Sequence, residues 1–179
     1  MGFYTRKGDD GKTGLLGDKR VSKANLIIEV NGCLDEANAV FGIIRSQTLS
    51  VEIKELVLDI QKKLYQLMTE VASNQKIKKF NFIDENSVLW IEQKISLFSE
   101  RVVIPKEFIV PGDSPHGAYF DFVRTIVRRS ERRLAELQEK TDLKNEYLLQ
   151  FLNRLSSLCF ILELYENNLY GNGNQTLVK

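Results

Sequence analysis

Apolar residues recur every three or four positions over most of this chain, which is the spacing of amphipathic helices. Ser22 has the side chain of an N-cap and stands where the first such pattern begins. No segment alternates between apolar and polar residues as a half-buried strand would. The predicted helices cover residues 22–47, 51–75, 84–101, 114–140 and 143–170.

The connections between these helices determine the expected architecture. All three prolines lie within residues 105–115, so the rest of the chain is free to form long helices. Apart from the loops 76–83 and 102–113, the connections are only a few residues long. The sequence therefore predicts an all-α, ferritin-like, five-helix up-and-down bundle in a single domain, residues 1–179. Within it we expect an N-terminal segment 1–21, the bundle 22–170 and a tail 171–179.

Composition and charge limit the classes of protein to which this chain can belong. The 179 residues include 25 Lys and Arg against 24 Asp and Glu, a net charge of +1, which disfavours a globally basic nucleic-acid-binding protein. A domain of this size needs no metal or disulfide to hold its core. Cys33 and Cys159 lie in apolar helical patterns and are expected to be buried thiols, with zinc and disulfides absent. With no long apolar run or leader pattern, we expect a cytoplasmic protein without a membrane segment.

The first irregular segment, residues 5–17, contains four glycines, two threonines and three basic residues. This composition suits backbone N–H groups that wrap around an anion. The triplet Gly11–Thr13 matches the end of a P-loop, but Arg6 stands where that motif needs its first glycine. Since no strand is predicted before it either, a P-loop NTPase is excluded. A phosphate-binding loop of another kind and a solvated terminus both stay open.

The predicted helix 114–140 carries a row of arginines opposite its apolar stripe. The planar guanidinium group suits bidentate binding of phosphate. A solvated helix face with local ion pairs is the alternative, and a nucleic-acid-binding bundle is a third that the balanced charge disfavours. Within a sector of about 100° this face holds Asp121, Arg124, Arg128, Glu131 and Arg132.

Two other predicted helices carry polar residues at positions where they could contact another element or a ligand. On the predicted helix 22–47, four small polar residues follow helical spacing away from the apolar stripe, as for a surface that another helix or subunit approaches closely. A solvated face is the alternative. Asn153 lies among core positions of the predicted helix 143–170, so we expect a buried amide with a partner or a ligand. The four residues are Asn31, Asp35, Asn38 and Gly42.

Taken together, five segments of the chain resemble the PduO-type ATP:corrinoid adenosyltransferases, a family that includes the mitochondrial enzyme of vitamin B12 metabolism. The segments occur in the family's order and spacing and span nearly the whole chain. The resemblance implies five-helix bundles assembled as homotrimers, with active sites between subunits. The matching segments are residues 4–23, 32–38, 108–112, 124–132 and 151–156.

The resemblance implies transfer of the 5′-deoxyadenosyl group of ATP to the cobalt of cob(I)alamin, yielding adenosylcobalamin and triphosphate. Arg128, Glu131 and Arg132 are the implied catalytic residues, and Mg²⁺ is implied to be held mainly by the ATP phosphates, with Glu131 nearby. Since cob(I)alamin is itself a strong nucleophile, such a protein positions the substrates and stabilises the leaving triphosphate. The implied ATP-binding residues are Thr5, Arg6, Lys7, Gly8, Thr13, Gly14, Lys23, Arg128, Arg129, Glu131, Arg132 and Asn153.

By the same resemblance, Phe108 lies beneath the corrin ring, where it displaces the lower cobalt ligand and makes four-coordinate Co(II) easier to reduce. From the residue alone, Phe108 could instead plug the bundle end. Asp35 is implied to pair with Arg124 of a neighbouring subunit. Asp113 and Asp121 depart from the glycine and histidine of many relatives, near the corrin end.

The resemblance also implies partners beyond the substrates. A cobalamin reductase would supply Co(I), and a B12-dependent enzyme would receive the product, whereas nucleic acid and membrane are not expected partners. A corrinoid or nucleotide carrier or chaperone on the same fold, without turnover, is the alternative. The presence of Lys23, Arg128, Glu131 and Arg132 favours the enzyme over the carrier.

Overall fold

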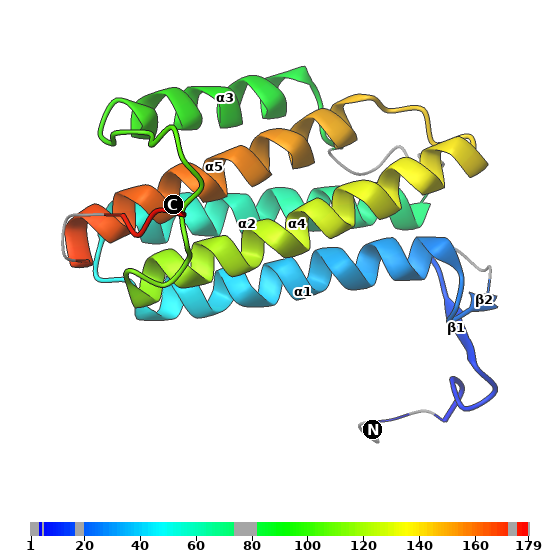
Figure 1. Ribbon diagram of the computed structural model, residues 1–179. Helices are drawn as coiled ribbons and strands as arrows, with labels where there is room; N and C mark the ends of the chain where they lie inside the picture. The colour runs from blue at the N-terminus through cyan, green and yellow to red at the C-terminus, as the bar shows by residue number, and fades with distance from the viewer. Residues whose placement is uncertain (1–3, 5, 17–19, 74–81, 172–174, 179) are drawn as a thin grey trace.

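The computed structural model describes residues 4, 6–16, 20–73, 82–171 and 175–178. The chain forms a five-helix bundle, as predicted, in which α1 packs on α2 and α4, and α5 packs on α4 and α3. Figure 1 shows the helices running side by side, with α3 outermost beside α5. The helices are α1 (Leu26–Gln47), α2 (Val51–Ser73), α3 (Glu85–Ser99), α4 (Pro115–Lys140) and α5 (Tyr147–Tyr170).

The core lies where the apolar stripes of these helices meet. Phe41 of α1, Phe120 of α4 and Phe151 of α5 are fully buried, as is Leu64 of α2. Burying a side chain of this size contributes about 1.5 to 3 kcal/mol to the stability of the folded state. None of the helices in the described part of the chain is long and apolar enough to cross a membrane.

Local capping sets helix boundaries that differ from the predicted ones. The first helix begins at Leu26 and not at Ser22, because Asn25 is the N-cap and its side chain accepts a hydrogen bond from the Ile27 amide over 3.0 Å. The fourth helix begins where it was predicted to begin, and Ser114 is its N-cap, accepting a hydrogen bond from the Gly117 amide over 3.0 Å. The expected end of the second helix, residues 74–75, lies outside the described residues.

The last helix begins at Tyr147, four residues later than predicted. The side chain of Asn145 instead holds the preceding segment against the bundle. Its Nδ2 donates to Oε1 of buried Glu70 over 2.8 Å and to the carbonyl of Ile83 over 2.7 Å. This tertiary network, which periodicity cannot predict, favours an extended connection over another helical turn.

A short hairpin was not predicted. Strand β1 (Lys12–Gly14) pairs antiparallel with β2 (Arg20–Ser22), and Thr13 lies opposite Val21. Three residues are too few for an alternating pattern to show. The hairpin precedes α1 and projects away from the bundle (Figure 1), so the prediction of a chain without strands is wrong at this point.

The C-terminal segment lies along the loop between α3 and α4. The amide of Val110 donates to the carbonyl of Thr176 over 2.7 Å, and the amide of Val178 donates to the carbonyl of Phe108 over 2.8 Å. The carboxylate of Asp113 accepts two hydrogen bonds from Thr176, one from the amide over 2.8 Å and one from the hydroxyl over 2.6 Å. The carboxylate of Asp113 therefore fastens the tail to the loop that carries Phe108.

Both cysteines are buried and unpaired in the structure, as predicted. Cys33 lies on α1 and Cys159 on α5. Burial raises the pKa of both thiols above the ordinary value. Since the thiolate is the reactive form, the two residues act as small core residues and not as nucleophiles.

Candidate functional site

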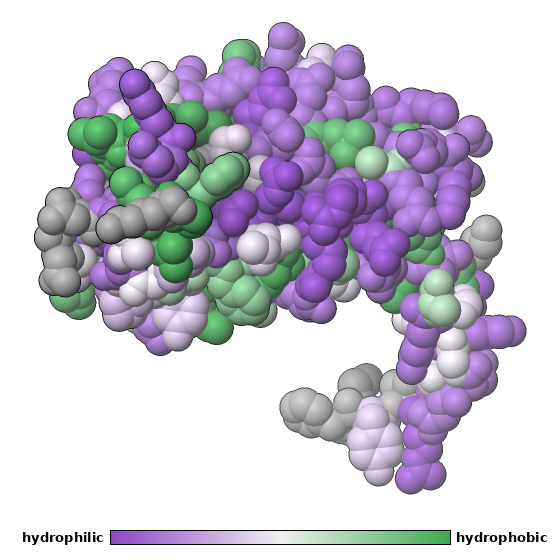
Figure 2. Space-filling view, in the orientation of Figure 1, coloured by the Kyte–Doolittle hydropathy of each residue, from purple (hydrophilic) through white to green (hydrophobic). Residues whose placement is uncertain are grey.

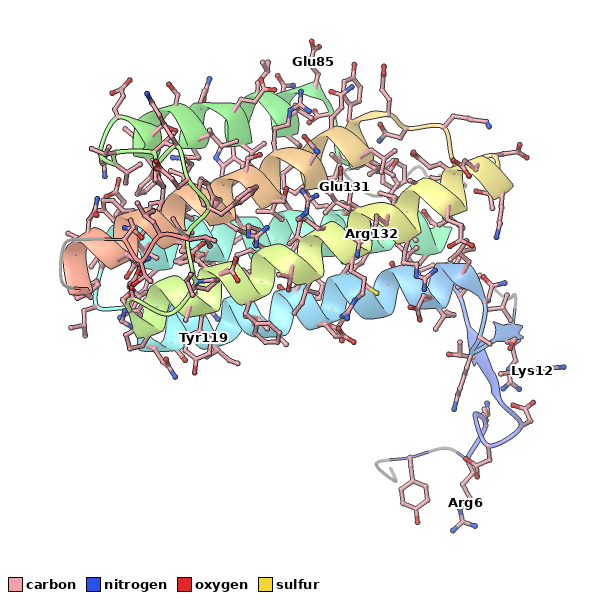
Figure 3. All side chains as sticks on the ribbon, viewed as in Figure 1. Arg6, Lys12, Glu85, Tyr119, Glu131 and Arg132 are labelled. Atoms are coloured by element: carbon pink, nitrogen blue, oxygen red, sulfur yellow. The ribbon has the colours of Figure 1, made fainter. Side chains whose placement is uncertain are left out.

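A polar pair lies across the contact between α4 and α5. Nδ2 of Asn153 donates to Oε1 of Glu131 over 3.0 Å. Arg128 and Arg132 flank the pair and line a hollow of about 320 Å³ together with it. Figure 3 shows Glu131 and Arg132 on neighbouring positions of α4. The structure therefore brings together four of the predicted site residues.

The arginines of this cluster are exposed and make no hydrogen bond or ion pair with any described side chain. An anion that enters the hollow can therefore use both guanidinium groups without breaking existing contacts. The expectation that Asn153 is buried is wrong, because its side chain is exposed. From its position on α5, the side chain of Asn153 points toward α4 and away from the core.

Arg129 does not join this cluster. Its guanidinium group forms an ion pair with Glu36 of α1. One residue along a helix is a rotation of about 100°, so Arg129 faces α1 while Arg128 faces α5. The prediction that Arg129 binds the nucleotide therefore has no support in the structure, which does not bring Arg129 to the other predicted residues.

The N-terminal loop and hairpin form a second basic hollow of about 320 Å³. Gly11 has a φ of 74°, a backbone conformation that glycine adopts freely. A Cβ on Gly8 would stand 3.2 Å from Nζ of Lys23, so the backbone of Gly8 lies close to this amine. Thr5 lies outside the described residues. The lining residues are Lys7, Gly8, Lys12, Thr13, Gly14, Arg20 and Lys23.

These two basic sites lie apart within one chain. Figure 3 shows Arg6 and Lys12 on the segment that projects from the bundle, whereas Glu131 and Arg132 lie along the middle of α4. The predicted ATP-binding residues therefore form two groups in the monomer. Arg6 belongs to the projecting group, is exposed, and has a φ of 57°.

Phe108 lies at the edge of a third hollow. The loop 107–111 forms one side of this hollow of about 340 Å³, and α4 and α5 form the other. Phe108 is 86% exposed, so it does not plug the end of the bundle. Figure 2 shows hydrophobic surface where this loop lies and hydrophilic surface over the middle of α4. Asp121 and Arg124 of α4 and Phe160 and Glu163 of α5 line the hollow.

Shared residues join the hollows into one trough along α4 and α5. A further hollow of about 440 Å³ shares Arg124 and Phe160 with the hollow at Phe108. It also shares Arg128 with the hollow at Glu131. The trough therefore has one end at Phe108, where apolar and charged side chains are mixed, and a cationic end at Arg128 and Arg132.

Within one chain, the guanidinium group of Arg124 is held by its own helix. Its Nε and Nη2 donate to Oδ1 of Asp121 over 2.8 and 2.6 Å. Asp35 is exposed on α1 and makes no ion pair with any described residue. The structure does not bring Asp35 and Arg124 of one chain together, and a pair between subunits stays a prediction.

The other polar residues of this face of α1 pack against α2, as expected for a surface that another helix approaches. Nδ2 of Asn31 donates to the carbonyl of Met68 over 3.3 Å. Nε2 of Gln61 donates to the carbonyl of Asn38 over 3.1 Å. A Cβ on Gly42 would stand 3.6 Å from Nε2 of Gln61.

Two carboxyl groups of α5 are fully buried. Burial raises the pKa of Glu163 to about 8 and that of Glu166 to about 7. The negative charge of Asp121 also raises the pKa of Glu163. Glu166 lies 3.4 Å from Nδ1 of His116, but neither its oxygens nor those of Glu163 have a hydrogen-bond partner in the described part of the chain.

We expect the free energy of unfolding to fall as the pH rises from 5 to 8. The folded protein keeps protons on Glu163 and Glu166 up to about pH 8 and 7, whereas the unfolded chain loses them near the ordinary value of 4.5. The native state therefore binds more protons, which costs on the order of 1 kcal/mol per pH unit for each group. Urea unfolding at a series of pH values measures the slope, and E163Q and E166Q should each reduce it. An unchanged slope in both variants would contradict the assignment.

Several residues that line these hollows were not predicted from the sequence. Arg20 joins the N-terminal hollow because the unpredicted hairpin brings it there. Phe160 and Glu163 line the hollow at Phe108. One signal was available for Glu163, because a glutamate at a core position between Leu162 and Leu164 is unusual.

Comparison with known proteins gives consistent matches. A family model described as cobalamin adenosyltransferase matches residues 3–166. The corrinoid adenosyltransferase PduO of Citrobacter freundii is 33% identical over 170 residues, 94% of this chain and 50% of the relative. The corrinoid adenosyltransferase of Bacillus subtilis is 32% identical over 178 residues, 97% of this chain and 91% of the relative. The chain spans about half the length of the PduO relatives it matches.

Solved structures match over almost the whole chain. A variant PduO-type ATP:corrinoid adenosyltransferase from Lactobacillus reuteri, complexed with cobalamin and ATP, has a TM-score of 0.90 and 27% identity, covering 99% of both chains. Another variant of that protein, complexed with ATP, has a TM-score of 0.89 and 29% identity, covering 99% of this chain and 100% of the other.

Proposed function

Since the chain belongs to the cobalamin adenosyltransferase family, we propose that it transfers the 5′-deoxyadenosyl group of ATP to the cobalt of cob(I)alamin. The observation that carries the proposal is the trough along α4 and α5. The exposed ring of Phe108 at one end suits contact with a corrin ring, and the cationic end at Arg128 and Arg132 suits a triphosphate. In the reaction, the cobalt–carbon bond to C5′ forms while the bond from C5′ to oxygen breaks, and the electron pair leaves with triphosphate.

The cationic end stabilises the leaving group in this proposal. Negative charge grows on the triphosphate as the bond breaks, and Arg128 and Arg132 offer guanidinium groups without other partners among the described side chains. Charge-assisted hydrogen bonds in a partly enclosed site are strong, so these groups lower the barrier. Asn153 holds the carboxylate of Glu131 beside them.

The residues at this end also fit a magnesium ion that binds with ATP. The described residues contain no group of three or more acidic, histidine or cysteine side chains that could hold a metal alone. The phosphates would therefore supply most ligands, and Glu131 would contact the ion directly or through water. Bound in this way, Mg²⁺ neutralises phosphate charge.

We further propose that the complete site forms between subunits of a homotrimer. Gly8, Thr13, Gly14 and Lys23 line the N-terminal hollow. The segment that forms it projects away from the bundle of its own chain (Figure 1). A neighbouring subunit can receive this segment, so that backbone N–H groups and Lys23 cover the triphosphate from the other side. Thr5, Arg6 and Lys7 belong to the same segment, the nucleotide-binding residues 1–21.

Replacing Asp35 by alanine tests the subunit contact. In the proposed trimer, Asp35 pairs with Arg124 of a neighbour, so the variant should lose about tenfold in activity, as for a half-buried ion pair. Sedimentation velocity measures the trimer and a coupled assay measures activity. E36A is the matched control, because Glu36 is the adjacent acid and its partner, Arg129, lies in the same chain. Unchanged sedimentation and kinetics in D35A would remove the assignment.

The reaction itself is tested by absorbance under anaerobic conditions. The purified protein is mixed with ATP, Mg²⁺ and chemically reduced cob(I)alamin, and the light-sensitive spectrum of adenosylcobalamin should appear together with free triphosphate. Binding of both substrates without product would favour a carrier or chaperone. In the cell, we propose a cytoplasmic enzyme that takes Co(I) from a cobalamin reductase and supplies a B12-dependent enzyme; the two unpaired thiols support a reducing compartment.

A further inference from the structure

Glu163 forms part of the wall of the hollow beside Phe108. It lies on α5 between Leu162 and Leu164, and its side chain is fully buried. Neither carboxyl oxygen has a hydrogen-bond partner among the described residues. A buried carboxyl without a partner is rare, because burial removes its water and returns nothing.

The charged groups that face Glu163 do not satisfy it. Asp121 and Arg124 face it from α4, and Asp113 faces it from the loop. Arg124, the one cation among them, already donates twice to Asp121, over 2.8 and 2.6 Å. Glu107 also lines the hollow and adds a further acid. Glu163 therefore stays a neutral carboxylic acid, with one O–H donor and one carbonyl acceptor.

A structural role does not account for this residue. Glu163 caps no helix end, joins no ion pair with a described residue and bridges no two elements. An apolar side chain of the same size would pack at this position without the cost of an unsatisfied polar group. Residues that reduce stability in this way are typical of binding sites, where a ligand supplies the missing partner.

We propose that Glu163 recognises a primary carboxamide on the rim of the corrinoid. The inference rests on the proposed function, since it assigns a role at the corrinoid end of the same trough. Cobalamin carries primary carboxamides around its ring. A neutral carboxylic acid matches this group, because it donates its O–H to the carboxamide oxygen and accepts an N–H from the carboxamide nitrogen. Glu163 is thus a specificity residue for the corrinoid.

Three variants of the full-length protein test this role. E163M removes the hydrogen-bonding head at nearly constant volume, whereas E163Q keeps one donor and one acceptor. E166M is the matched control, because Glu166 is also buried on α5 but does not line the hollow. The dissociation constant of cob(II)alamin is measured from its visible spectrum with ATP present and reductant absent, and the KM for ATP is measured separately.

We expect E163M to weaken cob(II)alamin binding about tenfold, the loss for one hydrogen-bonded pair, with the KM for ATP unchanged. E163Q should stay within about threefold of the original protein, and E166M should bind cob(II)alamin normally. E163M should also unfold at a higher temperature, since it removes an unsatisfied buried group. A purely structural role would change stability and leave corrinoid affinity alone.

Cobalamin derivatives with one carboxamide converted to a methyl ester identify the partner, because the ester lacks the N–H donor. The original protein should bind one such derivative about tenfold more weakly than cobalamin, and E163M should not distinguish the two. Equal affinity of E163M and the original protein for cob(II)alamin would overturn the inference. If the original protein itself neither bound nor adenosylated cobalamin, the proposed function would fail instead.

Discussion

Replacing Arg128 by alanine should reduce adenosyltransfer at least about a hundredfold, because the variant removes a preorganised charge where negative charge develops on the triphosphate. Arg128 is exposed and makes no ion pair with a described side chain, so its removal should leave the fold intact. Arg128 lines both the hollow at Glu131 and the next hollow along the trough.

The measurement is the initial rate of adenosylcobalamin formation with chemically supplied cob(I)alamin, together with circular dichroism and thermal unfolding. R133A is the matched control, since Arg133 lies on the same helix but contacts Glu136 over 3.1 Å, outside the trough. R133A should keep nearly full activity. An R128A variant that retains more than about a tenth of the rate would remove Arg128 from the catalytic role.

Replacing Phe108 by alanine should slow product formation from Co(II) much more than product formation from Co(I). When the reaction starts from Co(II) and a reductase, the rate should fall about a hundredfold: in the role that the family resemblance implies, Phe108 excludes the lower cobalt ligand, and its loss makes reduction of cobalt harder. With Co(I) supplied chemically, the loss should be much smaller. Phe108 is 86% exposed, so the change should not alter the free energy of unfolding.

Both rates are measured on the same preparation, and the ratio of the rates is the quantity of interest. F122A is the control, because Phe122 is another exposed aromatic residue, on α4, and does not line the hollow at Phe108. F122A should leave the ratio unchanged. Equal losses by both routes in F108A would mean that Phe108 contributes to binding in general and not to the state of the cobalt.

The C-terminal tail holds the loop that carries Phe108 in place through hydrogen bonds. Backbone hydrogen bonds join Phe108 and Val110 to the segment 175–178, and the two oxygens of Asp113 hold Thr176. The exposed ring is therefore carried by a loop that is paired on one side. Local sequence could not predict this pairing, because the tail and the loop are far apart in the chain.

Periodicity was sufficient to predict the helices and the core, since apolar spacing alone decides which face of a helix leaves water. It also placed Arg128, Glu131 and Arg132 on one sector of α4. The same argument misjudged Asn153, because the sequence does not record that the α4–α5 contact leaves this part of α5 open to solvent. The ends of α1 and α5 depended on Asn25 and Asn145, whose partners only the folded chain supplies.

The amino-acid sequence by itself determined the helical bundle, the apolar core, the glycine-rich and arginine-rich segments and the resemblance to a family. The tertiary structure alone decided that Arg129 turns to Glu36 on α1, and that the N-terminal segment with Arg6 and Lys12 stands apart from Glu131 and Arg132. It also decided that Glu163 lines the hollow at Phe108 without a partner among the described residues. The physical reason is that helical periodicity gives the direction of a side chain about its own axis, whereas its neighbours depend on how separate elements pack.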